Sequence, residues 1–158
     1  MPGVDTTELD AILASWGALL RDFPGMKRKM LERLAAEILT EVQAEIPGTG
    51  TVRSWQERYI GTRNGYVAVR PKADTFKVTK GGKRYAVGYV TNAIDGGHKH
   101  RKPSQVKKAG YTYHPRINVA AVPGLHFYDK VRRRLEGMSQ DELKELAAQV
   151  AAGLEGRG

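Results

Sequence analysis

The four histidines of this 158-residue chain lie close together in the sequence, as His98, His100, His114 and His126. The run Gly97–His100 places two imidazoles two residues apart, and such a pair could contribute to a zinc site. Zinc sites normally add Cys, Asp or Glu ligands to the pair, and a hydrolytic site also needs a general base. The chain has no cysteine, Asp95 is the only nearby acid, and the surrounding lysines and arginines would repel a cation. We therefore expect solvated loop histidines and no bound metal.

Motifs of the common enzyme classes are missing from the sequence. It contains no Gly-rich dinucleotide or P-loop motif and no GxSxG nucleophile turn. The lack of cysteine excludes thiol catalysis, iron–sulfur clusters and disulfides. The acids fall mainly on predicted helices, where solvent-exposed faces explain them. We expect a protein that is not an enzyme and holds no cofactor.

Basic residues are concentrated in the part of the chain that holds the histidines. Between Lys77 and Arg134 there are 14 lysines and arginines but two acids, whereas the rest of the chain has 12 basic and 15 acidic residues. This segment therefore carries the whole excess behind the formal net charge of +9. Such a patch attracts phosphate backbones or an acidic protein surface, and charge alone does not choose between them.

Residues 91–124 show no regular hydrophobic period and contain several glycine and proline breaks. A long unpatterned segment in a small domain is usually functional or disordered. We expect an extended basic loop or arm, flexible in the isolated chain, that contacts a neighbouring subunit or another protein. Tyr111, Tyr113 and His114 could instead stack on bases, so direct nucleic-acid recognition stays open. The candidate contact residues are Lys99, Arg101, Lys102, Lys107, Lys108 and Arg116.

Two helices are predicted over residues 5–46. Asp5 and Glu8 form a capping-box-like start, and Leu9, Ile12, Leu13, Trp16, Leu19 and Leu20 then recur at helical spacing. Pro24 and Gly25 should interrupt this helix, with a second helix starting there and running to about Glu45. The second helix has its own apolar face, formed by Met30, Leu31, Leu34, Ala35, Ile38 and Val42.

An antiparallel sheet of about four strands is predicted over residues 54–90, packed against the long N-terminal helix. The strands 55–60 and 66–70 read as a hairpin with Asn64-Gly65 in its turn. Two more strands, 75–78 and 84–90, flank Gly81-Gly82.

The remaining residues, 125–155, predict C-terminal helices. A short helix over 125–136 should end at Gly137, and Ser139 with Glu142 should cap the final helix. These elements predict one α+β domain over residues 1–158. The expected core contains Leu13, Trp16, Leu34, Ile38, Val67, Val87 and Phe127.

Three short sequence motifs follow one another along the chain in an order that resembles a known family. Pro47-Gly48-Thr49-Gly50 follows the long helix and precedes Arg53 and Ser54 at the expected start of the first strand. Tyr85-Ala86 leads to an acid-Gly-His turn that ends in Gly97-His98, and Pro123 precedes Phe127 at the closing helix. Over about residues 25–136 the chain resembles the tail-completion (minor tail component, head–tail connector) proteins of long-tailed phages. It departs from that pattern where Arg53 and Ser54 are adjacent and where residues 99–122 are longer and more basic.

The resemblance implies a subunit of a homo-oligomeric, hexameric ring in the virion neck. Such a ring would join the head-connector or stopper protein to the tail terminator or tail-tube protein, with DNA able to pass through its lumen. The implied location is the virion, and the host cytoplasm during assembly. A ring subunit needs two complementary surfaces, and a passive conduit needs no catalytic residue.

The alternative is a small basic nucleic-acid-binding protein or a ribosome-directed toxin, with basic and aromatic groups on the sheet face. A ring builder should form higher oligomers, whereas a toxin should be a monomer that arrests growth. In either case no apolar run reaches the ~18 residues that span a bilayer. The N-terminus lacks signal-peptide features, so we expect no export and no membrane partner.

Overall fold

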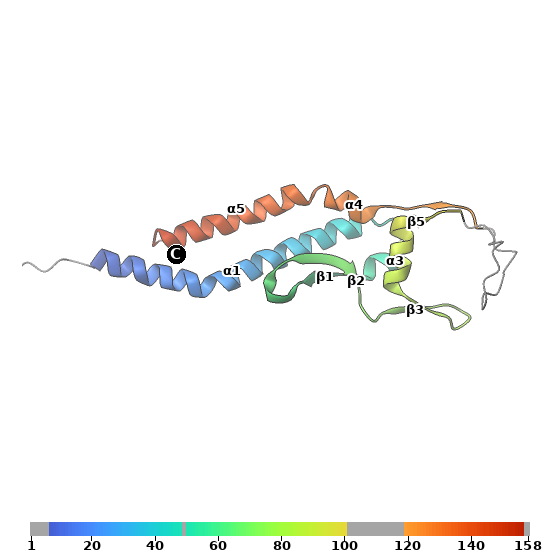
Figure 1. Ribbon diagram of the computed structural model, residues 1–158, viewed down its shortest axis with the longest axis horizontal. Coiled ribbons are helices and arrows are strands. Elements are labelled where there is room, and N and C mark those ends of the chain that lie inside the picture. Colours follow the sequence, from blue (N-terminus) through green and yellow to red (C-terminus); the bar gives the residue numbers. More distant parts are fainter. Residues whose placement is uncertain (1–6, 49, 101–118, 157–158) are drawn as a thin grey trace, which may run out of the picture.

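One long helix, α1 (Thr7–Glu45), runs along most of the length of the molecule. A second, α5 (Leu135–Leu154), lies antiparallel beside it, as the computed structural model in Figure 1 shows. The structure describes residues 7–48, 50–100 and 119–156. Short strands and the helices α3 (Val87–Gly96) and α4 (Phe127–Arg132) gather at the C-terminal end of α1. The predicted α+β class is confirmed.

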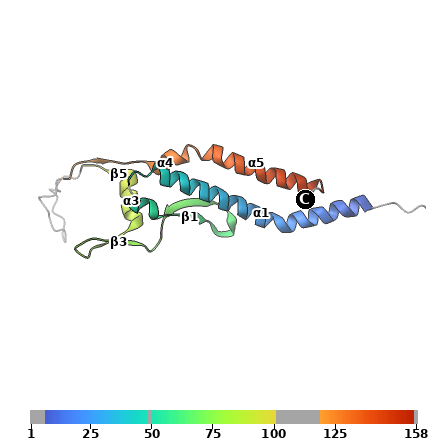
Figure 2. The same cartoon turned by 180° about the vertical axis from the view of Figure 1, so that it is seen from behind.

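The predicted break at Pro24-Gly25 is wrong, because α1 continues through Pro24. Proline removes one helical hydrogen bond and its ring crowds the preceding turn, which bends a helix when the surroundings allow it to continue. Both residues are exposed, so water can reach the carbonyl that loses its partner. Figures 1 and 2 show the bend in the blue N-terminal part of α1.

The apolar stripe of α1 continues through the bend but is covered mainly in the C-terminal half. All six residues of the apolar face predicted for that half are buried: Met30, Leu31, Leu34, Ala35, Ile38 and Val42. In the N-terminal half, Leu13 is 54% exposed and Trp16 is 45% exposed, so their predicted burial is wrong. The physical reason is that, within the described residues, α5 is the element that lies beside this part of α1, and it packs mainly on a different side of the helix, at Ser15.

The strands form separate antiparallel pairs instead of the predicted four-stranded sheet. β1 (Gln56–Ile60) pairs antiparallel with β2 (Val67–Pro71), and Gln56 lies opposite Pro71. The 3-10 turn η1 (Thr62–Asn64) connects them. β3 (Phe76–Val78) pairs with β4 (Arg84–Ala86), and β5 (Gly97–His98) pairs with β6 (Val122–Pro123). In the described residues these are three two-stranded sheets, and β1–β2 is the one that packs on α1.

The strand predicted over 84–90 ends at Ala86, and α3 begins at the next residue, Val87. Tyr85, Val87 and Tyr89 alternate as in a strand, but Val87 and Thr91 also lie one helical turn apart. Both are fully buried, so burial of this helical face favours a helix over a strand here. The backbone N–H of Val87 donates to Thr75 O over 2.9 Å, which ties the start of α3 to the residue before β3.

The C-terminal helices begin and end at different residues from those predicted. α4 ends at Arg132, and α5 starts at Leu135 and passes through Gly137, which therefore does not end a helix. Arg134 anchors this start by ion pairs to Glu41 (3.1 Å) and Glu45 (2.9 Å) on α1. Ser139 does not cap α5, and its hydroxyl donates to Glu136 O within the helix.

The core lies where α1, β1–β2 and α4 meet. Phe127 is fully buried and Val131 is 2% exposed, while the predicted core residue Val67 is half-buried against them. The predictions for Leu34, Ile38, Val87 and Phe127 are confirmed. The buried cluster consists of Leu34, Ile38, Val42, Ile46, Phe127 and Val131.

Candidate interaction surfaces

The first motif stretch builds the turn between α1 and β1. Gly50 has φ of 107°, a conformation that favours glycine, directly before the short helix α2 (Thr51–Ser54). Arg53 Nε donates to Ile46 O over 2.6 Å and so satisfies a carbonyl just beyond the C-terminus of α1. Ser54 Oγ donates to Thr51 O, so Ser54 closes α2 instead of opening a strand. Pro47 is exposed at the start of this turn, and Thr49 lies outside the described residues.

The second and third motif stretches meet through β5 and β6. Gly97 has φ of 65°, and a side chain on it would collide with the backbone of Val122 and Gly124. The backbone N–H of His126 donates to Asp95 O over 3.0 Å, which fixes the entry into α4. Phe127 then enters the core. Most of the described motif residues therefore have roles in turns, in strand pairing or in the core.

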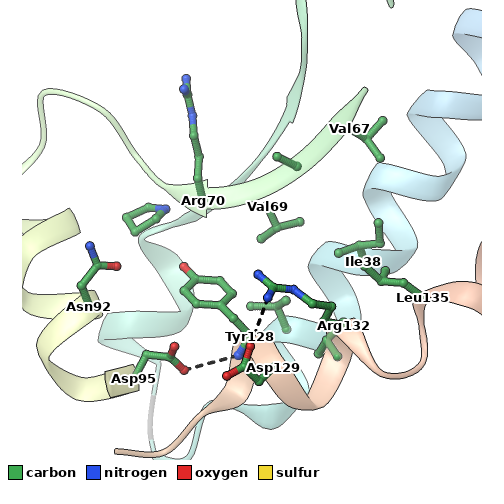
Figure 3. Close-up of a pocket in the computed structure, with 14 residues that line it drawn as sticks. Ile38, Val67, Val69, Arg70, Asn92, Asp95, Tyr128, Asp129, Arg132 and Leu135 are labelled. Atoms are coloured by element: carbon green, nitrogen blue, oxygen red, sulfur yellow. Dashed lines mark hydrogen bonds and ion pairs between the residues drawn. The ribbon is translucent and has the colours of Figure 1, made fainter. Parts of the chain in front are cut away.

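Next to this junction lies a cavity of about 460 Å³ between β2, α3 and α4. Figure 3 shows Tyr128 at its centre, with Asp95 and Asn92 facing it from α3. The Tyr128 hydroxyl donates to Gln56 Oε1, and Asp95 Oδ1 accepts from the Tyr128 backbone N–H over 3.3 Å. Burial, and then the negative charge of Asp95, raise the pKa of Tyr128 well above its ordinary value. The phenol is therefore neutral and acts as a structural donor.

Arg70 and Arg132 border the same cavity but turn to other partners. The Arg70 guanidinium lies 3.8 Å from the centre of the Tyr59 ring, and Figure 3 shows its side chain pointing away from Tyr128. Arg132 pairs with Asp129 over 3.5 Å. The sequence did not lead us to predict the Tyr128–Gln56 pair. The available clue was that Tyr128 directly follows the motif residue Phe127.

A second, more apolar hollow lies near the opposite end of the molecule from the α1 N-terminus; we call it the basic-end groove. Its volume is about 600 Å³, and β3–β4, α3 and β5–β6 form its walls. Tyr89 is 62% exposed, and His98 Nδ1 is 3.0 Å from Lys99 O. The motif residues Tyr85 and His98 thus share one surface. The lining residues are Lys77, Thr79, Tyr85, Tyr89, Val90, Ala93, Ile94, His98, Val122, Pro123 and Leu125.

The predicted basic arm is described only in part. Lys99 is exposed directly after β5, beside the groove. The predicted loop over 91–124 is wrong at its edges, since 91–96 belong to α3 and residues 97–98 and 122–123 form β5 and β6. The other predicted contacts, Arg101, Lys102, Lys107, Lys108 and Arg116, lie outside the described residues.

A third surface is the uncovered part of the α1 stripe, which we call the N-terminal stripe. Beside it, Ser15 Oγ donates to Gly153 O over 2.6 Å, so α5 holds the neighbouring side of the helix. Trp16 belongs to the stripe and also reaches α5, because its Nε1 donates to Leu154 O over 3.1 Å. The stripe residues are between 40% and 77% exposed. They are Leu9, Ile12, Leu13, Trp16, Leu20 and Phe23.

Neither a metal site in the described residues nor a known relative assigns a function to these surfaces. Within the described ranges, no three His, Cys, Asp or Glu residues are grouped so that they could hold a metal. The same part of the chain has no helix that combines the length and the apolar character needed to cross a bilayer. No protein-family model matches the sequence, and neither the curated proteins nor the solved structures yield a match.

Proposed function

We propose that this protein is a structural virion protein of a tailed phage, a tail-completion subunit of the neck ring. In this proposal, six copies join the head-connector or stopper protein to the tail terminator or tail-tube protein, and the protein catalyses no reaction. The sequence resemblance to tail-completion proteins suggests this role. The single observation that carries it is the N-terminal stripe, six large apolar side chains at 40–77% exposure on one helix face.

A contiguous apolar surface of this kind needs a partner. Single exposed leucines are common on monomers, but clustered ones mark interaction sites. Burying one large apolar side chain contributes about 1.5–3 kcal/mol. A subunit that leaves six of them in water is therefore suited to assembly, and the resemblance suggests which assembly.

The direct test has two measurements on the full chain. Native mass spectrometry over a range of concentrations, with electron microscopy, should show higher oligomers with ring-shaped particles. A tagged copy expressed from the encoding phage or prophage should be found in purified virions at the neck. A chain that stays monomeric and is absent from virions would contradict the proposal.

One observation favours the alternative of nucleic-acid binding. Tyr85 and Tyr89 line the basic-end groove beside Lys77, a combination that could stack bases and hold phosphates. Fluorescence anisotropy with single-stranded DNA and RNA separates the two functions. Under the alternative, salt-sensitive binding is weakened by Lys77→Ser and Tyr89→Ala, and expression of the protein arrests growth. Metal-dependent nuclease activity that is lost in His98→Ala/His100→Ala would also contradict the structural role.

A further inference from the structure

Exposed apolar side chains gather at both ends of this elongated molecule. At one end is the N-terminal stripe on α1, and at the other the basic-end groove has Tyr89, Val122 and Leu125 in its walls, each 37–62% exposed. Figures 1 and 2 show α1 starting at one end and β3 and β5 lying near the other. One molecule therefore cannot cover its own stripe with its own groove.

Given the proposed ring function, we infer that the N-terminal stripe of one copy docks into the basic-end groove of the next copy. The contact is heterologous, since two different surfaces meet. Such a contact repeats from copy to copy and closes into a ring when the rotation between copies permits. The proposed function names the assembly, and this inference names the two surfaces that build it.

Charge complementarity supports a second copy as the occupant of the groove. Residues 7–26 and 146–156, which form the stripe end, hold four acids and a single basic residue, Arg21. Residues 72–100, which include most of the groove, hold six lysines and arginines and two acids, Asp74 and Asp95. Opposite net charges attract the two ends and disfavour pairing of two like ends.

The shapes of the two surfaces also fit. Leu9, Leu13, Trp16 and Leu20 follow one another at alternating four- and three-residue spacing, the pattern with which an amphipathic helix anchors in an apolar groove. The groove volume of about 600 Å³ is large enough for several apolar side chains. Lys77 and His98 lie among its lining residues, where they can face the acidic residues that flank the stripe.

Cysteine cross-linking tests the contact cleanly, because the chain has no cysteine of its own. Leu20→Cys marks the stripe and Tyr89→Cys marks the groove, and both positions are more than half exposed, so neither change should disturb folding. Gln140→Cys on α5 is the control, exposed and outside both surfaces. The purified full-length variants are mixed in pairs and treated with a short bismaleimide.

We expect a covalent dimer from Leu20→Cys mixed with Tyr89→Cys, and its loss when Gln140→Cys replaces either one. Reversing charge in the groove with Lys77→Glu should weaken association about tenfold, equivalent to ~1.4 kcal/mol. A second reversal on the stripe, Glu8→Lys, should restore part of that loss.

Other outcomes overturn the inference and are distinguishable from failure of the proposed function. Cross-linking of Leu20→Cys to itself would mean that two stripes pair face to face. Oligomers without a stripe-to-groove cross-link would place the interface elsewhere. Protection of Tyr89→Cys from maleimide by a DNA oligonucleotide, and not by a second copy, would assign the groove to nucleic acid. In the first two cases, a tagged chain still found at the neck of virions would leave the ring function standing.

Discussion

The two halves of α1 carry the same apolar pattern in different surroundings. In the C-terminal half, Leu34 is 9% exposed beneath β1–β2 and α4, whereas in the N-terminal half Leu13 is 54% exposed and Leu20 is 77% exposed. Periodicity therefore identifies which face of a helix is apolar but not what covers it. The cover comes from residues distant in sequence. Among the described residues none covers the N-terminal stripe, and this is the observation from which we propose a second copy as its partner.

Removing the side chain at the centre of the covered half should have the largest effect. Phe127 is fully buried and its ring centre lies 4.6 Å from that of Tyr128, so Phe127→Ala leaves a cavity between α4 and α1. We expect a loss of about 3–5 kcal/mol in the free energy of unfolding, measured by urea denaturation. A loss below about 1 kcal/mol, the size of an average substitution, would show that α4 does not close the core.

Two leucines, one in each half of α1, test the difference in burial between the halves. Leu34→Ala in the covered half should lower the free energy of unfolding by about 2–5 kcal/mol. Leu13→Ala in the uncovered half should change it by less than ~0.5 kcal/mol when measured at a concentration at which the protein is monomeric. Equal losses at the two positions would mean that the N-terminal stripe is covered within the monomer.

Gly97, the first residue of β5, tests how the β5–β6 pair is held together. Gly97→Ala forces a side chain into a positive-φ position against the backbone of Val122, and should cost about 1–3 kcal/mol from the backbone conformation alone. Gly96→Ala is the control, because a side chain there meets no atom within 4 Å. If the two variants are equally stable, the β5–β6 pairing does not depend on Gly97.

The Tyr128–Gln56 hydrogen bond joins α4 to β1 and should give the smallest effect, with a pH signature. Tyr128→Phe should cost about 0.5–1.5 kcal/mol near neutral pH. Because the pKa of Tyr128 is raised in the folded state, its stabilising contribution is complete below about pH 10, the pKa of an unfolded tyrosine, and is lost as pH rises above that. The variant should therefore lose stability less steeply in alkali. Parallel alkaline profiles for the two proteins would contradict the assignment.

Local patterns predicted much of this fold. The stripe from Met30 to Val42, the β1–β2 hairpin and burial of Phe127 followed from periodicity and turn residues, because each depends on neighbouring residues. Helix ends were less predictable. Pro24 and Gly137 are helix breakers by local preference, yet both lie inside helices. At Leu135, packing on α1 and the ion pairs of Arg134 outweigh the local signal.

The candidate surfaces could be predicted only in part. Charge counting located the basic end, and Tyr85 and His98 were singled out by the motif, but nothing local indicated that they line one groove. That groove depends on β5–β6 pairing between residues more than twenty positions apart, and on α3 forming where a strand was expected. The N-terminal stripe was recognised as apolar, while its exposure depends on the absence of a covering element in the described part of the fold.

The most direct test of the account is the solution mass of a variant with a polar N-terminal stripe. Leu9→Gln/Leu13→Gln/Leu20→Gln replaces three exposed leucines by another good helix former, and Leu143→Gln changes a comparably exposed leucine on α5 as the control. We predict that wild type and the control form the same higher oligomer in native mass spectrometry. The triple variant should be a folded monomer with unchanged helical circular dichroism. A triple variant that assembles like wild type would contradict the claim that this stripe is the assembly surface.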